Sequence, residues 1–499
     1  MPRDSLVLGV DCSTHGAKAV AWTFDGTPVA EGRAEFELLR PRSGWYEQHA
    51  DDWRRATVDA IGQVARTHGR DICAIGITHQ RETFVGVDRD GHAVRNAIVW
   101  MDERAVSQVG ELRAAVSDDA FHRITGKPLS VTPSVSKILW IRQHEPAAFR
   151  KAERWLDVLA FLVRALTGVD ATSAASAESM GLVDLARGAW SQVLLQAVGL
   201  SPDNVPRLVP AGTVVGTLLE DIASDLGLPA GLPVVATAGD GQAAAVAAGV
   251  FDLDLAYLNL GTAIVSGTVG PAFLTSRAFR TMGGAVPGTF LFESDLKGGT
   301  FTIDWLIERL LGQSLSLAEL ETRAAAVPPG AEGLVLVPYL AGVMNPYWDD
   351  DASGILIGLR GNHGPAHVFR AILEGIAFEQ RLHLREIERA TGVPIREVRV
   401  LGGGAASSLW CGILADVLRR PVVRTRSREA TSLGAAMMAA AAIGLFPSAR
   451  QAADAMGATA ESFVPGPASA HYSDIFDQVY EVIYPALRDA LGGLAVLSR

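Results

Sequence analysis

The feature that most constrains the fold is a unit that occurs twice: two short apolar runs separated by a turn of small residues. The first copy has apolar runs at 5–10 and 19–24 around the turn 11–18, and the second has runs at 255–260 and 264–269 around 261–263. Such runs around a small-residue turn predict pairs of antiparallel strands. Because both halves of the chain begin in this way, we expect two domains of related construction.

Helical and strand patterns alternate after each hairpin. Trp53 and Ile61 belong to one apolar stripe of a helix that we expect Asp51 and Asp52 to cap. Buried strands are expected at 73–77, 232–237 and 398–401, with helices at 242–250 and 409–418. Alternation of this kind predicts an α/β fold, with ligands at the carboxyl ends of the strands. We place a domain boundary near 251/252, giving domains 1–251 and 252–499 that pack around a cleft.

Charge and cysteine content exclude several classes of function. The net charge is −11, from 44 basic and 55 acidic residues, which argues against a nucleic acid or an anionic membrane as the main partner. Cys12, Cys73 and Cys411 are too widely spaced for a disulfide framework or a zinc site, which favours a reducing, cytoplasmic location. The longest apolar stretch, near 435–445, is shorter than the ~20 residues that a membrane span needs.

The first turn carries groups that suit an anion. Asp11 stands at the strand end, and Thr14 and Lys18 follow it. Small residues let backbone N–H groups approach an anion, and a lysine neutralises its charge. The alternative is an ordinary hairpin with a surface lysine. The turn is not a Walker A loop, because the chain has no GxxxxGK[ST].

Asp240 lies between Gly239 and Gly241, where a strand gives way to a helix. The glycines remove steric cover, so the carboxylate can enter a cleft, although an N-cap aspartate is the common alternative. The turn Gly261-Thr262 and the run Gly402–Gly404 also follow expected strands. Together, glycine turns at several strand ends could hold a nucleotide.

A trio of polar residues, Gln80, Arg81 and Glu82, ends another strand, and Trp100 and Asp102 end a further one. An amide, a guanidinium and carboxylates can bind several hydroxyls of a polyol. A solvated Arg–Glu pair is the plain alternative. His363 and His367 are expected in a loop and at a helix start rather than as metal ligands. GxSxG and GxGxxG are both absent, which weakens hydrolase and dehydrogenase interpretations.

Two longer stretches are specific to one family. Residues 132–144 contain Lys137 followed three residues later by Trp140, and 354–359 precede 367–374 by seven residues. Together with the turns above, these motifs resemble the signatures of the FGGY family of carbohydrate kinases, over about residues 6–447.

The resemblance implies two actin-like (ribonuclease H-like) domains, with a sugar-binding N-terminal domain and a nucleotide-binding C-terminal domain. It implies Mg-ATP-dependent phosphorylation of a terminal hydroxyl, with Asp240 as the catalytic base, and Asp11 and Asp240 near Mg²⁺ through water. The family often has arginine in place of Lys18. We expect substrate contacts from Gln80, Arg81, Glu82, Trp100, Asp102 and Asp240. The resemblance assigns ATP binding to Thr14, Lys18, Gly261, Thr262, Gly299, Gly404, Ala405 and Ser408.

Three positions bear on the substrate. Thr132, Val265 and Gly241 are smaller than the tyrosine, phenylalanine and glutamine of the glycerol-phosphorylating members, so we expect a larger pocket. This favours a xylulokinase-like activity on a ketopentose such as D-xylulose, with glycerol or a tetritol such as erythritol as alternatives. A more distant alternative is an actin-like ATPase that binds partners and phosphorylates no sugar. A homodimer is left open.

Overall fold

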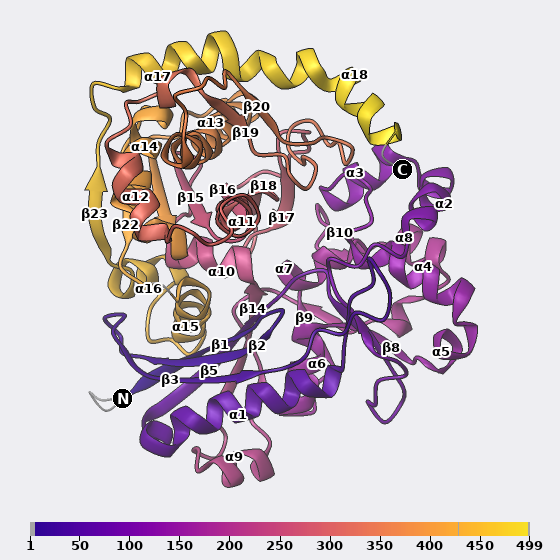
Figure 1. The fold of residues 1–499 in the computed structure, drawn as a ribbon. Coiled ribbons are helices and arrows are strands. Elements are labelled where there is room, and N and C mark those ends of the chain that lie inside the picture. Colours follow the sequence, from indigo (N-terminus) through magenta and orange to yellow (C-terminus); the bar gives the residue numbers. More distant parts are fainter. Residues whose placement is uncertain (1–4, 428, 498–499) are drawn as a thin grey trace.

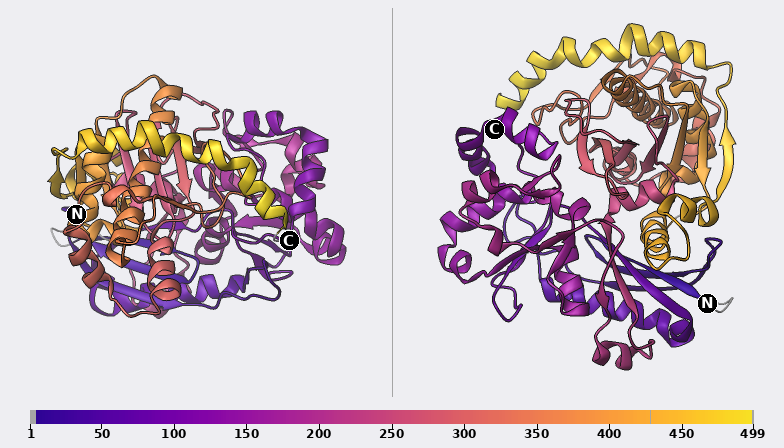
Figure 2. Two further views of the ribbon diagram at one scale, coloured as in Figure 1. Left: turned by 45° about the horizontal axis from the view of Figure 1, so that its top comes forward. Right: turned by 180° about the vertical axis from the view of Figure 1, so that it is seen from behind.

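Two mixed β-sheets form the centres of two lobes in the computed structural model, which describes residues 5–427 and 429–497 (Figure 1). Figure 2 shows the same two lobes from two further sides. The N-terminal sheet has the order β13 (Thr213–Thr217), β14 (Pro233–Gly239), β5 (Ile72–His79), β1 (Leu6–Cys12), β2 (Gly16–Trp22) and β3 (Pro28–Glu35). The C-terminal sheet has the order β17 (Arg280–Gly283), β18 (Phe290–Leu296), β16 (Ile264–Gly270), β15 (Leu255–Leu260), β21 (Glu397–Leu401), β22 (Val422–Thr425) and β23 (Thr459–Phe463).

The two predicted hairpins are confirmed, and they enter their sheets in the same way. β1 pairs antiparallel with β2, which sets Asp11 opposite Lys18, and it pairs parallel with β5. β15 likewise pairs antiparallel with β16 and parallel with β21. The duplicated hairpin therefore marks the start of each central sheet.

The outer face of the N-terminal sheet is covered by α1 (Ala50–His68), α6 (Val158–Thr167) and α9 (Glu220–Leu226). Trp53 and Ile61 of α1 are fully buried, as the apolar stripe predicts. The expected cap is wrong, because the helix begins at Ala50 and its N-cap is His49, two residues before Asp51. Asp51 and Asp52 instead lie in the first turn, where their charges favour the helix dipole.

Two helices fill the space between the sheets. α10 (Asp240–Ala247) and α15 (Ala430–Ala442) contribute small side chains to one apolar cluster with both sheets. They lie so close that a Cβ on Gly434 would be 1.9 Å from the carbonyl oxygen of Ala243. The alanine-rich stretch noted in the sequence is thus mostly a buried helix between the lobes. No helix within the described residues is long and apolar enough to cross a membrane.

The outer face of the C-terminal sheet packs on a second set of helices, which forms the largest apolar core of that lobe: α12 (Leu317–Ala325), α13 (Pro365–Thr391), α14 (Ser408–Leu418), α17 (Ser469–Ile475) and α18 (Glu481–Leu497). The predicted strand at 398–401 and helix at 409–418 correspond to β21 and α14. His367 lies in the first turn of α13, and His363 lies in the loop before it. The three cysteines are free.

A smaller subdomain extends the N-terminal lobe, and most of it lies between β5 and β14 in the sequence. It is built on a four-stranded sheet whose order is β4 (Glu47–Gln48), β7 (Ala97–Ile98), β6 (Phe84–Val87) and β8 (Arg154–Asp157). Its helices share one apolar cluster: α2 (Val106–Val116), α3 (Asp118–Thr125), α4 (Ser134–His144) and α8 (Gln192–Val198). The strand ends that carry Gln80–Glu82 and Trp100–Asp102 therefore lie where this subdomain joins the central sheet.

Candidate active site between the two sheets

Asp240 is the first residue of α10, directly after β14 ends at Gly239. The N-cap position belongs to Gly239 and has no side-chain cap, so Asp240 is not an N-cap aspartate. Its Oδ1 accepts the N–H of Gly241 at 2.8 Å and lies 2.9 Å from Nε of Arg81. The side chain is 42% exposed. A carboxylate that is oriented by an arginine and still accessible can act on a hydroxyl.

Arg81 comes from the neighbouring strand end and is held on its other side by the C-terminal lobe. Its Nη1 lies 3.0 Å from both carboxylate oxygens of Glu293 on β18, and Tyr257 of β15 donates to Oε2 of the same residue at 3.0 Å. Glu293 is fully buried. Burial alone would raise the pKa of Glu293, but Arg81 and Arg280 outweigh it and lower the pKa to about 2. Glu293 thus stays charged and fixes Arg81 across the two lobes.

The glycines beside Asp240 make room for this arrangement. A Cβ on Gly239 would lie 2.5 Å from Cγ of Arg81, and a Cβ on Gly241 would lie 2.7 Å from Oε2 of Glu293. Both distances are too short for any larger residue without displacing a buried charge. At Gly241 the expectation of an enlarged pocket is therefore wrong, because Glu293 and Arg81 occupy that space.

Glu82 follows Arg81 in a strained conformation. Its φ is +58°, in the left-handed region that a residue with a Cβ rarely adopts. Ser179 and Ser134 hold its backbone N–H and carbonyl at 3.1 and 2.9 Å. Its Oε1 is buried and accepts no hydrogen bond from the described residues. Strain of this kind at a buried carboxylate is typical of a functional site.

Gln80 and Asp102 are buried and already hydrogen-bonded. Gln80 donates to Gln48 at 3.0 Å and accepts from Thr83 at 3.2 Å. Asp102 accepts two hydrogen bonds from Arg104 at 2.8 Å and one from the backbone N–H of Tyr46 at 2.6 Å. Through these hydrogen bonds, both side chains stabilise the loops that follow the strands. Their direct contact with substrate stays a prediction.

Trp100 is the exposed aromatic of this edge, with 38% of its surface accessible. Its indole N–H donates to Oγ1 of Thr14 at 3.1 Å, which connects the substrate side with the first phosphate turn. Lys137, which the sequence indicated only as part of a motif, donates to the carbonyls of Trp100 and Thr132 at 2.9 and 2.8 Å. Burial lowers the pKa of Lys137 to about 7. This lysine therefore orders the Trp100 loop from inside the protein.

Asp11, the residue before the end of β1, lies close enough to Asp240 for their charges to interact. Burial raises the pKa of Asp11 to about 6, and the charge of Asp240 adds to the shift. Oδ2 accepts from Thr431 at 2.8 Å, whereas Oδ1 is buried and has no hydrogen-bond partner among the described residues. Two interacting carboxylates with an unpartnered oxygen fit a hard divalent cation such as Mg²⁺.

Lys18, opposite Asp11, forms an ion pair with Glu429, the residue before α15. Arg33 of β3 also lies 3.4 Å from Glu429. The lysine of the first turn is thus partly neutralised by the C-terminal segment. A phosphate entering this turn would compete with Glu429 for Lys18.

In the C-terminal lobe, the turn Gly261–Thr262 and the run Gly402–Gly404 offer mainly backbone groups for binding. Gly261 and Thr262 accept the N–H groups of Thr300 and Phe301 at 3.0 and 3.3 Å, at the start of α11 (Thr300–Trp305). Gly299 sits against this turn, since a Cβ there would lie 2.7 Å from both carbonyl oxygens. The remaining predicted nucleotide contacts, Gly404, Ala405 and Ser408, lie between β21 and the first residue of α14.

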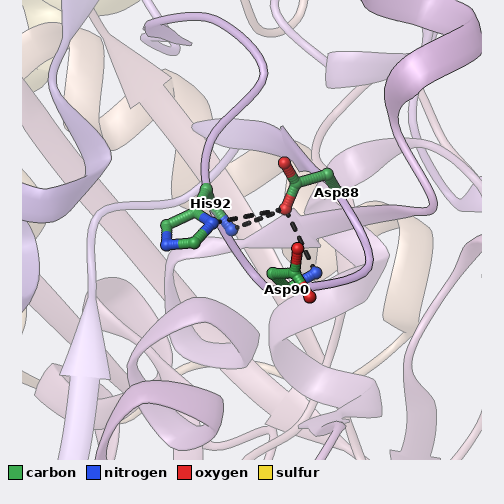
Figure 3. Close-up of side chains that lie close together, drawn as sticks. All are labelled: Asp88, Asp90 and His92. Atoms are coloured by element: carbon green, nitrogen blue, oxygen red, sulfur yellow. Dashed lines mark hydrogen bonds and ion pairs between the residues drawn. The ribbon is translucent and has the colours of Figure 1, made fainter.

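A separate group of potential metal ligands lies away from these residues, in the turn after β6. Asp88, Asp90 and His92 come close together there (Figure 3). Oδ1 of Asp88 accepts the backbone N–H groups of Asp90 and His92 at 3.2 and 3.0 Å, and Oδ2 lies 3.3 Å from Lys151. These contacts explain why the three side chains lie close together in an exposed turn without a metal ion.

Comparison with known proteins agrees with this arrangement. The FGGY N-terminal domain of carbohydrate kinases matches residues 6–247, and the FGGY C-terminal domain matches residues 256–443. The chain is 29% identical to a xylulose kinase of Bacillus subtilis over 97% of both chains. It is 34% identical to a glycerol kinase of Trichlorobacter lovleyi, over 88% of this chain and 90% of that one.

Among solved structures, the xylulose kinase of Rhodospirillum rubrum superimposes with a TM-score of 0.90 at 29% identity, over 97% of this chain and 99% of the other. The predicted pair of actin-like α/β domains is confirmed by this likeness. The relatives include kinases of two different substrates. They therefore establish the class of reaction but do not identify the substrate of this chain. The chain belongs to the FGGY family of carbohydrate kinases and is an ATP-dependent sugar or polyol kinase.

Proposed function

We propose that this chain transfers the γ-phosphoryl group of ATP to a terminal hydroxyl of a ketopentose such as D-xylulose. The observation that carries the proposal is the Arg81–Asp240 pair, which lies next to Glu82 along the chain and close enough to Asp11 for the charges of the two aspartates to interact. Both hydrogen-bonding contacts of the Asp240 carboxylate within the described residues involve Oδ1. Oδ2 is left to accept the hydroxyl proton.

In this mechanism Asp240 orients the acceptor hydroxyl and takes its proton late, as negative charge moves onto the transferred group. Lys18 and the backbone of the Gly261–Thr262 turn stabilise the phosphates. Asp11 and Asp240 would hold Mg²⁺ through water, and the ion when bound would neutralise phosphate charge. Gly404, Ala405 and Ser408 line the adenosine end.

Two side chains support a substrate larger than glycerol. Thr132 and Val265 are both partly exposed, and neither is an aromatic wall. Val265 is paired with Asp295 of β18, on the face of the sheet that carries Glu293. A longer polyhydroxylated substrate would fill the space that a small ligand leaves. We also propose that the two domains divide at 251/252, with the main sugar contacts, the phosphate hairpin and the catalytic aspartate in the first domain and most of the nucleotide contacts in the second.

The direct test is ADP formation from ATP with and without added D-xylulose, D- and L-ribulose, erythritol and glycerol. A sugar-dependent increase with a pentulose is expected. ADP formation that no sugar raises above background would reject the kinase assignment in favour of an ATP-driven binding protein.

A further inference from the structure

Two charged residues near the candidate base, Arg280 and Asp295, have no place in the mechanism above. Arg280 opens β17 directly opposite Glu293 on β18, and Asp295 lies two residues further along β18. Residues two apart on a strand share a face, so Asp295 lies on the same side of the sheet as Glu293. That side also carries Tyr257, which belongs to the apolar cluster between the lobes. The side chains of Arg280, Glu293 and Asp295 therefore face the N-terminal lobe and Glu82.

Arg280 holds these carboxylates together without satisfying them. Its Nη2 lies 2.6 Å from Glu293 but 3.5 Å from Oδ2 of Asp295, and its Nη1 lies 3.6 Å from Oε1 of Glu82. The two longer contacts are ion pairs beyond good hydrogen-bond distance. Arg280 and Glu82 are 7% and 6% exposed.

Arg280, Glu82 and Asp295 each have one buried polar atom with no hydrogen-bond partner within the described residues. The atoms are Nε of Arg280, Oε1 of Glu82 and Oδ1 of Asp295. They offer one donor and two acceptors, contributed by both lobes. A buried polar group without a partner is costly, so a cluster of three indicates that a ligand completes it. A hydroxyl group suits such a cluster because it donates and accepts at once.

The charge of the cluster decides which hydroxyl compounds fit. Arg81 and Arg280 face four carboxylates, namely Glu82, Asp240, Glu293 and Asp295. Negative charge is thus in excess, and the guanidinium groups are already paired. A carboxylate or phosphate on the substrate would meet like charges, whereas a neutral polyol would not.

We propose that Arg280 and Asp295, with Glu82, form a second hydroxyl-binding subsite, which binds the part of a neutral sugar distant from the reacting hydroxyl. The inference rests on the proposed kinase function and deepens it. It makes Arg280 and Asp295 specificity-determining residues that gain importance with the length of the substrate. It also excludes sugar acids as preferred substrates.

The first experiment compares Asp295→Asn with the wild type by kcat/KM for D-xylulose, erythritol and glycerol. We expect a loss of about tenfold or more for the pentulose, and less than about threefold for glycerol, which is too short to reach the subsite. Asp350→Asn is the matched control, since that aspartate is 88% exposed beside Lys297, and it should leave all three values unchanged. Equal losses for all three substrates, or no loss, would overturn the subsite and leave the kinase assignment intact.

The second experiment uses the wild type alone and compares D-xylulose with D-xylonate, a sugar acid that also has five carbons. Preference for the neutral sugar is expected, and preference for the acid would overturn the subsite while confirming a kinase. This comparison tests the subsite without a variant, and it replaces the first experiment if Asp295→Asn is misfolded and does not melt cooperatively. Failure of every sugar to raise ADP formation would remove the proposed function and the subsite with it.

Discussion

The proposed substrate side and the proposed nucleotide side of the site are built from different chemical groups. On the substrate side, buried arginines and carboxylates from both lobes hold one another at 2.6–3.0 Å, as in Arg81, Glu293 and Arg280. On the nucleotide side, glycine turns such as Gly261–Thr262 present backbone groups, and the lysine of the first turn pairs with a partly exposed glutamate.

The difference indicates where each kind of recognition is encoded. In the proposed mechanism, backbone N–H groups bind the phosphates of ATP, which are the same for every sugar, so changes there should affect every sugar equally. Buried charges with fixed partners can distinguish one pattern of hydroxyls from another. We therefore expect changes on the substrate side to alter catalysis and selectivity, and changes on the nucleotide side to alter the KM for ATP.

The largest effect is expected for Asp240→Asn, which removes the proton acceptor and keeps the shape of the side chain. Turnover should fall by a factor of ~100 or more. Steady-state kinetics with a saturating pentulose would measure the loss, and the melting temperature should stay near that of the wild type. Asp225→Asn, on the exposed helix α9, is the control. Near-normal turnover in Asp240→Asn would remove this residue from the role of base.

Glu293→Gln tests whether the link between the lobes contributes stability through its charge. The variant leaves Arg81 and Arg280 without their shared carboxylate, and we expect a loss of about 3 kcal/mol in the free energy of unfolding near neutral pH. Because the pKa of Glu293 is lowered from 4.5 to about 2 in the folded protein, the native state binds fewer protons than the unfolded state between these values. This contribution is complete above about pH 4.5 and is lost as the pH falls toward 2.

Denaturant unfolding of the wild type and Glu293→Gln at pH 7, 5, 4 and 3 measures this dependence. The difference in unfolding free energy should shrink as the pH falls. A difference that is constant across this range would show that the charge of Glu293 contributes nothing to stability.

Much of this arrangement could be predicted from local sequence, and the part that could not has a physical reason. Asp240 and Arg81 follow strands that proved to be parallel neighbours, so their meeting was predictable from the rule that strand ends share an edge. Glu293 and Arg280 come from antiparallel strands of the other lobe. Their approach to Arg81 depends on how the lobes pack, which no local pattern contains.

Gly241 illustrates the same limit. The sequence predicts added space where this residue lacks a side chain. In the structure, that space is occupied by the carboxylate of Glu293, more than fifty residues away in the chain. The lysine of the first signature is a second case, because a buried lysine that binds three backbone carbonyls has no periodic pattern.

Gly299→Ala tests the nucleotide side. Its Cβ would press on the carbonyl oxygens of Gly261 and Thr262 and shift the second phosphate turn. We expect the KM for ATP to rise about tenfold, by the same factor whichever sugar is the acceptor. Initial rates at varied ATP with two different sugars would measure it. A change in sugar preference without a change in the KM for ATP would contradict the division between the two sides.

The smallest expected effect is a change of preference in the double variant Thr132→Tyr with Val265→Phe. Two aromatic side chains would narrow the proposed sugar pocket and weaken pentulose turnover more than glycerol turnover, by several-fold in the ratio of the two kcat/KM values. Parallel kinetics with both acceptors measure the ratio. A greater loss with glycerol would mean that these positions do not line the pocket.

The central claim is that the substrate side selects a neutral sugar longer than glycerol. Its most direct test is kcat/KM of the unmodified protein for D-xylulose, D- and L-ribulose, erythritol and glycerol, measured side by side with saturating ATP. The account predicts that a pentulose has the highest value and glycerol the lowest. Glycerol as the best of the five would contradict it.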